Sequence, residues 1–412
     1  MLKASALYLV VVIALVIAVF CASLITVAAF YRQEHQKSMR YAELSVNLES
    51  GRTLILSSNY QLYDQDDRLD LFEEESDSVL LRKEHWGIFD LGTVSAFSQK
   101  DTLSQSFLIG LDASGDKSVI YLADEDRPLS VSGRTQIVGA ADLPKAGIKQ
   151  AYVDGRPYEG KELVKGAIRE SGRSLPELNK TLILQLREAL QDSSESDPVS
   201  ADSVSHSFFL NVKKVRIPRR NPIVGDSYSG KIMLLCDTVL TIKKDARLSN
   251  VLVFAPGIVI EKGFRGSCQL FAVDSVVTNG SVSFDYPSAI GVLSKGKGGN
   301  QPKIALGEGS RFSGILFTYE QERSDLQTQI SLGKNCKVLG EIHASGFVKL
   351  EKPVIIEGKV ACNRFIIQTP STLYENYLID IIINRSKRSP YYLTSSLLNS
   401  TSKEQRVLKW LK

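Results

Sequence analysis

A six-residue repeat constrains the fold of this chain more than any other feature of its sequence. Between residues 328 and 369 the chain reads TQISLG, KNCKVL, GEIHAS, GFVKLE, KPVIIE, GKVACN and RFIIQT, with apolar residues at nearly every third and fifth place. Residues two apart point to the same face of a β-strand, and glycine at the first place supplies the permissive backbone of a corner. The repeat predicts a mainly β fold: a parallel β-solenoid with three short strands per turn.

The third and fifth places of the hexads are the positions expected to fill the interior. The third places in the last run are Ile330, Cys336, Ile342, Val348, Val354, Val360 and Ile366. The same pattern begins at residue 226, with Leu234, Leu240, Leu252 and Ile258 among its third places, and it resumes at residue 302 after a break. Because such a coil buries its core only by stacking turns, its ends need caps.

These patterns divide the chain into six predicted segments. They are a transmembrane anchor with a helical extension (1–58), a mixed β lead-in (59–126), the first solenoid hexads (127–144), an insertion with an amphipathic helix and a polar loop (145–225), the main β-solenoid (226–369) and a C-terminal cap (370–412). The helix of the insertion is indicated by leucines at four-residue spacing, Leu178, Leu182, Leu186 and Leu190. We expect it to pack on the flank of the solenoid, with binding of a partner as the alternative.

Residues 5–31 form an uncharged apolar run that is long enough to enter a bilayer. About 20 apolar residues span the hydrocarbon core of a membrane. A cleaved signal peptide is the alternative, but the run far exceeds the ~7–15 residues of a signal h-region. We therefore expect a single-pass membrane protein whose residues 5–31 contact the lipid bilayer.

The N-terminal region resembles the first helix of type IV pilins and pseudopilins, with Lys3 before the apolar run as in a prepilin leader. Lys3 itself stands where the leader glycine should be, and Tyr8 where most members have a glutamate. The resemblance implies that the solenoid lies outside the cytoplasm, which is the orientation we expect. The positive-inside rule leans slightly the other way, because Arg32, Lys37 and Arg40 follow the run.

The hexads of residues 328–369 resemble those of the bactofilins, bacterial polymer-forming proteins built on a β-solenoid with three short strands per turn. The resemblance implies a structural protein that associates with itself. The insertions, the long N-terminal anchor and the predicted C-terminal cap depart from that family, and they put end-to-end polymerisation in doubt.

The stretch KKVRIPRR, residues 213–220, is the strongest candidate for a charged binding surface. Its basic residues are Lys213, Lys214, Arg216, Arg219 and Arg220. They suggest a polyanion or polysaccharide partner, with an ordinary solvated face as the alternative. The net charge of +4 over 412 residues gives no reason to expect a specific nucleic acid.

Sites for chemistry are weakly indicated. GVLSKGKG, residues 291–298, has the spacing of a phosphate-binding loop, but a strand pattern follows it where a helix should begin. His343 is the only histidine in the repeats, and its place between inward Ile342 and Ala344 predicts that it points into solvent. We expect no catalytic residue, cofactor or metal site.

The sequence thus favours a non-enzymatic, membrane-anchored β-solenoid that acts as a scaffold or assembly component of a bacterial cell envelope, associated with a pilus or secretion machine. A surface module that binds a polysaccharide or another polyanion and a tethered bactofilin-like cytoskeletal polymer are the alternatives. In each case a protein partner or self-association is expected.

Overall fold

The computed structural model describes residues 2–71, 77–153, 155–192, 197–198, 203–296, 300–322, 325–368, 372–398 and 403–412. These residues are mainly β, with a parallel sheet and one long apolar helix at the N-terminus, as predicted. The chain divides into two compact units, which are described in turn: Met1–Lys83 with Gly92–Gln105, and Glu84–Leu91 with Ser106–Lys412.

A six-stranded sheet follows the N-terminal helix in the chain. Its strands run in the order β1 (Asp66–Leu69), β2 (Asp77–Trp86), β3 (Phe89–Ser98), β4 (Asp101–Asp112) and β29 (Leu393–Thr394), and β30 (Gln405–Leu411) also pairs with β4. β1 is antiparallel to β2, and β29 and β30 are antiparallel to β4. The segment 370–412, predicted as a cap, therefore contributes its last two strands to this sheet.

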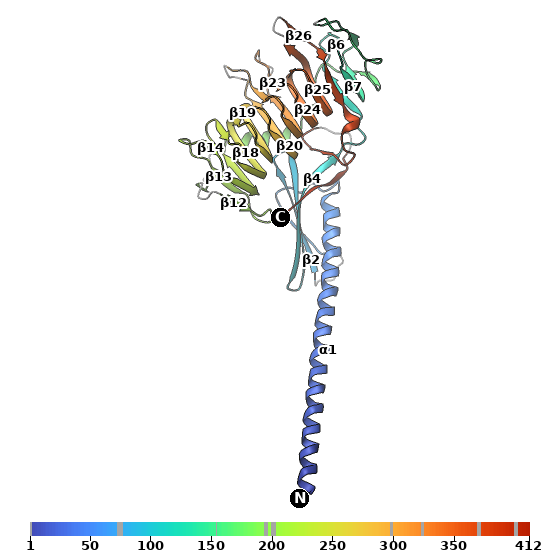
Figure 1. The fold of residues 1–412 in the computed structure, drawn as a ribbon, viewed down its shortest axis with the longest axis vertical. Coiled ribbons are helices and arrows are strands. Elements are labelled where there is room, and N and C mark those ends of the chain that lie inside the picture. The colour runs from blue at the N-terminus through green and yellow to red at the C-terminus, as the bar shows by residue number, and fades with distance from the viewer. Residues whose placement is uncertain are drawn as a thin grey trace. The chain divides into compact units, whose positions relative to one another are not determined.

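The longest element of the first unit is α1 (Leu2–Ile55), an uninterrupted helix of 54 residues, shown in blue in Figure 1. At 1.5 Å per residue it is about 80 Å long. Every side chain from residue 6 to residue 39 is exposed. Closer to the C-terminal end, buried residues recur at the three- and four-residue spacing of one helix face. They are Leu44, Asn47, Leu48, Gly51 and Ile55.

Gly51 lets α1 lie directly on strands β2 and β3. A Cβ atom at this position would come within 2.8 Å of the Cγ1 atoms of both Val79 and Val94. An ion pair between Arg40 Nε and Asp101 Oδ2, 3.0 Å apart, joins the helix to β4 one turn before the buried face begins. The C-terminal part of α1 is thus packed against protein, and its apolar N-terminal part is not.

The second unit is built on a large parallel sheet, whose hydrogen-bonded path closes on itself. Its long strands are β18 (Arg247–Ile260), β19 (Arg265–Thr278), β20 (Ser283–Ser294), β22 (Arg311–Glu320), β24 (Lys337–Leu350) and β25 (Val354–Gln368). The shorter strands in this unit are β5 (Ser118–Leu122), β6 (Leu129–Ser132), β7 (Gln136–Val138), β8 (Ala140–Leu143), β9 (Ile148–Gln150), β10 (Ile168–Glu170), β11 (Asp197–Pro198), β12 (Ser203–His206), β13 (Lys213–Arg216), β14 (Ile223–Val224), β15 (Ser227–Gly230), β16 (Ile232–Leu235), β17 (Leu240–Ile242), β21 (Lys303–Leu306), β23 (Gln329–Leu332), β26 (Leu373–Glu375), β27 (Tyr377–Ile379) and β28 (Ile381–Asn384). We call strands β12 to β25 the parallel stack.

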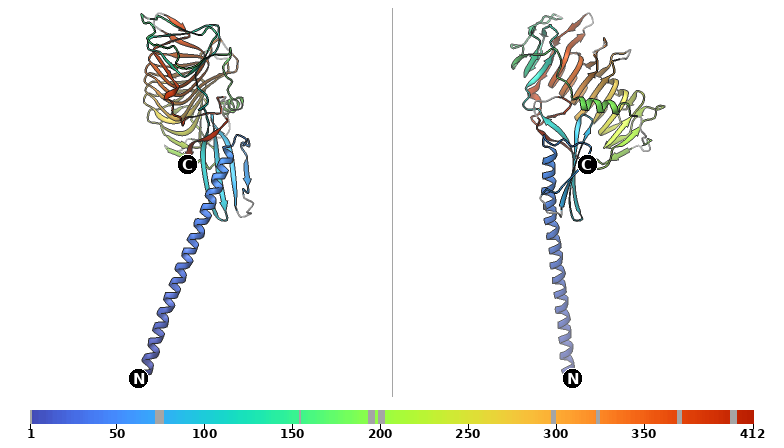
Figure 2. Two further views of the ribbon diagram at one scale, coloured as in Figure 1. Left: turned by 90° about the vertical axis from the view of Figure 1, so that its right-hand side faces the viewer. Right: turned by 180° about the vertical axis from the view of Figure 1, so that it is seen from behind.

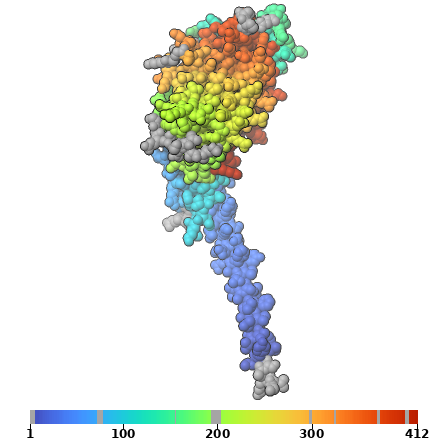
Figure 3. Space-filling model, turned by 60° about the vertical axis from the view of Figure 1, so that its left-hand side comes forward, coloured from blue at the N-terminus to red at the C-terminus, as the bar shows by residue number. Residues whose placement is uncertain are grey.

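The spacing of the paired residues in the parallel stack matches three hexads. Ile330 pairs with Val348, and Ile342 pairs with Val360, in each case 18 residues further along the chain. From β22 to β24 the step is longer, since Phe312 pairs with Val338, because the break in the repeat near residue 322 lies between them. Figure 3 shows the result as successive bands of colour across this unit.

The interior of the parallel stack is filled by the predicted hexad positions, with two corrections. Ile342, Val348 and Val360 are all buried in one core cluster. Leu252, predicted inward, belongs to a second cluster on the outer face, because the pairing of β18 with β19 shifts register before Val251. Ile366 is also not inward, because Val348 pairs with Phe365, only 17 residues on.

Glycines at the first place of the hexads form one corner of the parallel stack. Gly314 and Gly340 have φ angles of 142° and 138°, which disfavour other residues. A Cβ atom on Gly340 would lie 2.0 Å from the carbonyl oxygen of Gly314, and one on Gly358 would lie 1.7 Å from the carbonyl oxygen of Gly340. Only glycine lets successive turns approach so closely here.

The strands early in the chain pair with the late end of the stack. Val360 of β25 pairs with Ile120 of β5, and Ile382 of β28 pairs with Gln136 of β7. The first hexads, residues 127–144, therefore follow the last ones in space. The insertion 145–225 supplies strands to both ends, because β10 pairs with β8 whereas β12 pairs with β15. Part of its predicted polar loop, residues 193–196 and 199–202, lies outside the described residues.

A second apolar cluster covers one outer face of the parallel stack. It includes three phenylalanines whose rings contact one another, Phe254, Phe271 and Phe317, together with side chains of α2 (Lys180–Ala189), which Figure 2 shows in green in its right-hand view. Leu182 and Leu186 of α2 are buried in this cluster, as the leucine spacing predicts. Leu178 precedes the helix, and Leu190 ends it.

Candidate functional site

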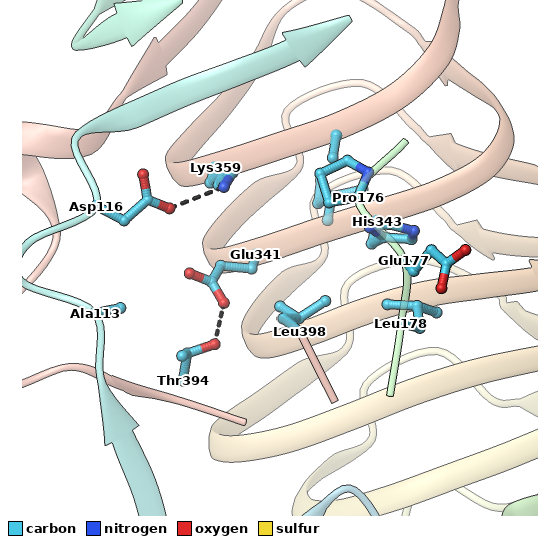
Figure 4. Close-up of a pocket in the computed structure, with 12 residues that line it drawn as sticks. Ala113, Asp116, Pro176, Glu177, Leu178, Glu341, His343, Lys359, Thr394 and Leu398 are labelled. Atoms are coloured by element: carbon cyan, nitrogen blue, oxygen red, sulfur yellow. Dashed lines mark hydrogen bonds and ion pairs between the residues drawn. The ribbon is translucent and has the colours of Figure 1, made fainter. Parts of the chain in front are cut away.

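Four ionisable side chains, two of them buried and two half-buried, gather on the outer face of β24 and β25, where the hexad positions point away from the core (Figure 4). Glu341 and His343 project from β24, and Lys359 projects from β25. Asp116, which precedes β5, approaches them from one side. The Arg173–Leu178 segment, which we call the strap, approaches from the other.

Glu341 is held by two groups of the C-terminal segment. Its Oε1 atom lies 2.9 Å from Nη1 of Arg388, and each of these two side chains is only 6% exposed. The hydroxyl of Thr394 donates a hydrogen bond to Oε2. Arg388 also lies over the ring of Tyr392, 4.4 Å from its centroid. The carboxylate and the guanidinium are therefore compensated despite their burial.

Lys359 and Asp116 form a second ion pair, with Nζ and Oδ2 2.8 Å apart. Burial alone would raise the pKa of Asp116, but the charge and hydrogen bond of Lys359 outweigh it and hold that pKa below its usual value. Arg385 stands nearby and donates hydrogen bonds to the carbonyl oxygens of Ala113 and Ser118, 2.8 and 3.2 Å away. The cluster thus joins the chain before β5 to the stack.

His343 is buried, with 6% of its surface exposed, so the prediction that it points into solvent is wrong. It does point out of the core, but the strap and Leu398 cover it. Burial, with a smaller contribution from the charge of Lys359, lowers its pKa to about 4. Among the residues that the structure describes, none forms a hydrogen bond with its imidazole. A neutral imidazole therefore stands in this cluster without a protein partner.

The cavity beside these groups has a volume of about 40 Å³. A water molecule occupies roughly 30 Å³ in the liquid. The cavity therefore has the size of a water site and not that of a substrate pocket. The ion pairs and hydrogen bonds of the cluster hold the C-terminal segment and the chain before β5 against the stack.

The basic stretch lies at the opposite end of the stack, on β13 and the turn after it. Lys214 Nζ lies 2.6 Å from Asp192, and Arg216 and Arg219 lie 2.5 and 3.0 Å from the two carboxylate oxygens of Asp237. Lys213 is half-buried and Arg220 is exposed. These acidic partners offset much of the positive charge, and polyanion binding by Lys213 to Arg220 stays a prediction.

In the ranges that the structure describes, the candidate phosphate loop, the cysteines and the possible metal ligands give no indication of a second site. In the candidate phosphate loop, Lys297 and Gly298 lie outside the described residues, and the next element is the strand β21. Cys236, Cys268, Cys336 and Cys362 are buried and unpaired. Within the described part of the chain, no group of three or more His, Cys, Asp and Glu side chains is arranged to hold a metal ion.

The apolar part of α1 is the remaining functional feature. By length and composition, α1 is able to cross a membrane. Its large apolar side chains are exposed, including Leu15 at 63% and Phe20 at 65%. Such a surface is unfavourable in water and suited to lipid.

Comparison with known proteins gives no relative from which a family could be assigned: no family model, curated protein or solved structure matches this chain.

Proposed function

We propose that this protein is a non-enzymatic scaffold of a bacterial cell envelope, anchored in the membrane by α1. The main support for the proposal is that the two parts of this helix have different surroundings. Residues 6–39 are exposed and mostly apolar up to residue 31, whereas Leu44, Leu48 and Ile55 are buried against protein. One helix therefore serves as a lipid-embedded segment and as part of a folded unit.

In this proposal the second unit is a β-solenoid. The 18-residue step between paired residues supports three hexads per turn, and the corner glycines support close stacking of the turns. A stack of parallel ladders with a continuous apolar interior is rigid, because each turn is hydrogen-bonded to both neighbours. Rigidity suits a spacer or an assembly component.

The charged cluster supports a structural role over a catalytic one. Glu341, Lys359 and Asp116 are all engaged in ion pairs. The cavity beside them is of water size, so it does not admit a substrate together with a reacting group.

A pilin-like arrangement is the form of the proposal that we favour, with the solenoid outside the cytoplasm. A long N-terminal helix whose second part packs on β2 and β3 supports it. In a bactofilin-like polymer, the end of the stack in one molecule would have to meet the end of the stack in the next. Here β5 and β28 already pair with β25, and β7 pairs with β28, which favours a capped scaffold.

A charge placed in the apolar run tests the anchor. Arginine in the middle of a membrane helix costs about 2.5–3.5 kcal/mol per residue. We expect the double variant Val12→Arg with Val16→Arg to be released from membranes by an alkaline wash, and the wild type to stay. Gln36→Arg, outside the apolar run, is the matched control.

The intact mass of the membrane-bound chain also distinguishes an anchor from a cleaved signal peptide. Release of the wild type would contradict the proposal.

A further inference from the structure

An open groove adjoins the buried cluster, and His343 lines both. The groove has a volume of about 320 Å³, within the range of small-molecule sites. One wall is the strap, and the other is formed by residues of β22, β24 and β25. Its lining side chains include Glu177, Tyr319, His343, Ser345 and Asn363.

The groove is preformed, because the strap is fixed near both ends. The hydroxyl of Tyr121 donates a hydrogen bond to the carbonyl oxygen of Ser174, 3.0 Å away. At the other end Leu178 pairs with Leu398, and the backbone N–H of Asn179 donates a hydrogen bond to the carbonyl oxygen of Leu397, 2.9 Å away. A ligand would therefore not have to order this segment on binding.

His343 gives the groove an unused polar group. Its imidazole is more than nine-tenths buried and hydrogen-bonds none of the described residues. In the neutral form it offers one donor and one acceptor. The ring nitrogens of His343 are not among the enclosed polar atoms that lack a partner, so they reach the groove. A ligand or water in the groove can therefore form a hydrogen bond with them.

The charges around the groove are already balanced. Lys180 and Glu177 lie 3.0 Å apart, Arg173 pairs with Asp126, and Lys359 pairs with Asp116. Glu320 accepts a hydrogen bond from the backbone of Thr328. No ionic ligand is needed to compensate this set.

What remains is a neutral hydrogen-bonding surface next to an aromatic ring. Ser345 and Asn363 belong to successive turns, and the amide of Asn363 donates to the carbonyl of Ser345. Tyr319 also lines the groove, with Arg187 5.4 Å from its ring centroid. Sugars combine hydroxyl groups that need donors and acceptors with C–H faces that pack on aromatic rings.

We infer that this groove binds one or two residues of a neutral glycan, with His343 hydrogen-bonded to a sugar hydroxyl. The site is separate from the basic stretch around Lys213. The inference goes beyond the anchored scaffold, and its failure would leave the membrane test of α1 unaffected.

The test uses the full chain in lipid nanodiscs and three soluble neutral tetrasaccharides: of N-acetylglucosamine, of β-1,4-linked glucose and of α-1,4-linked glucose. Saturation-transfer NMR and titration calorimetry report binding. We expect at least one to bind at millimolar concentration or below. His343→Leu and Asn363→Ala should each weaken binding about tenfold, the value of one lost hydrogen bond.

Two further variants make the result specific. His343→Gln keeps a donor and an acceptor and should bind more tightly than His343→Leu. The double variant Arg219→Ala with Arg220→Ala changes the exposed basic turn, and it should bind as the wild type does. Thermal unfolding checks that each variant is folded. Absence of binding by all three probes, or equal affinity of the wild type and folded His343→Leu, would overturn the inference.

Discussion

At the scale of single residues, the corner glycines decide how closely turns of the parallel stack approach. Gly314, Gly340 and Gly358 lie in register on β22, β24 and β25. Each lies against the backbone of the turn before it, so no side chain fits between them. The regular return of glycine in the sequence therefore has a steric cause.

Replacing Gly340 by alanine tests this cause. The new Cβ atom would overlap the carbonyl oxygen of Gly314, and the φ angle of 138° is strained for alanine. We expect a loss of roughly 2–4 kcal/mol in the free energy of unfolding, or failure to fold. Gly115→Ala is the control, because nothing lies within 4 Å of its Cβ position. Chemical denaturation measures both; equal stability of the two variants would refute the steric explanation.

His343 makes stability depend on pH. Its pKa is about 4 in the folded chain, whereas the ordinary pKa of a solvated histidine is 6.5. The unfolded state therefore takes up the proton first as the pH falls. Above pH 6.5 the neutral His343 costs the folded chain nothing in unfolding free energy. As the pH falls from 6.5 to 4, the unfolding free energy decreases because of this residue, by about 3 kcal/mol in all.

A His343→Gln variant should lose this dependence. We expect the wild type to lose about 3 kcal/mol more than the variant in unfolding free energy between pH 6.5 and 4. His206→Asn, which changes a histidine outside the cluster, should keep the wild-type slope. Parallel pH profiles for the wild type and His343→Gln would show that His343 is not buried in its neutral form.

At the scale of elements, buried polar contacts fasten the C-terminal segment to the stack. The hydroxyl of Tyr286 on β20 donates to the carbonyl of Leu393 at 2.6 Å. Glu341 on β24 binds both Arg388 and Thr394. These contacts lie immediately before and within β29, so they position the chain that goes on to pair with β4.

A double-mutant cycle on Glu341 and Arg388 measures this fastening. Arg388→Met alone leaves a buried carboxylate without its cation, and we expect it to cost about 3–5 kcal/mol of unfolding free energy. Combining it with Glu341→Gln should recover most of that loss, because the uncompensated charge is removed. Additive effects of the two substitutions would mean that the pair is not coupled in the folded protein.

At the scale of the whole molecule, the order of the strands along the chain differs from their order in the stack. The periodicity predicted which side chains fill the interior, because a spacing of two fixes the face of a strand. It carries no information on which turn a strand pairs with, so the position of β5 beside β25 could not be predicted. The hexads also cannot predict a one-residue shift in the register of strand pairing, such as the shift at Phe365.

The charged cluster escaped prediction for a related reason. Glu341 and Lys359 occupy outward hexad positions, where charged residues are ordinarily solvated. Asp116 and Arg388 come from segments without a repeat, far apart in the sequence. The continuous apolar runs NVLVFA and SAIGVL were the available signal that one outer face is covered, because strands buried on both faces lose their alternation.

We propose that α1 holds a solenoid at the outer side of a membrane, and labelling of a single cysteine tests this orientation. Asp245 is exposed on the stack, so Asp245→Cys presents a reactive thiol. Cys21 is replaced by alanine, and the four remaining cysteines are buried. We expect a membrane-impermeant maleimide to label this cysteine in intact cells. Protection until the cells are lysed would place the stack inside and contradict the proposal.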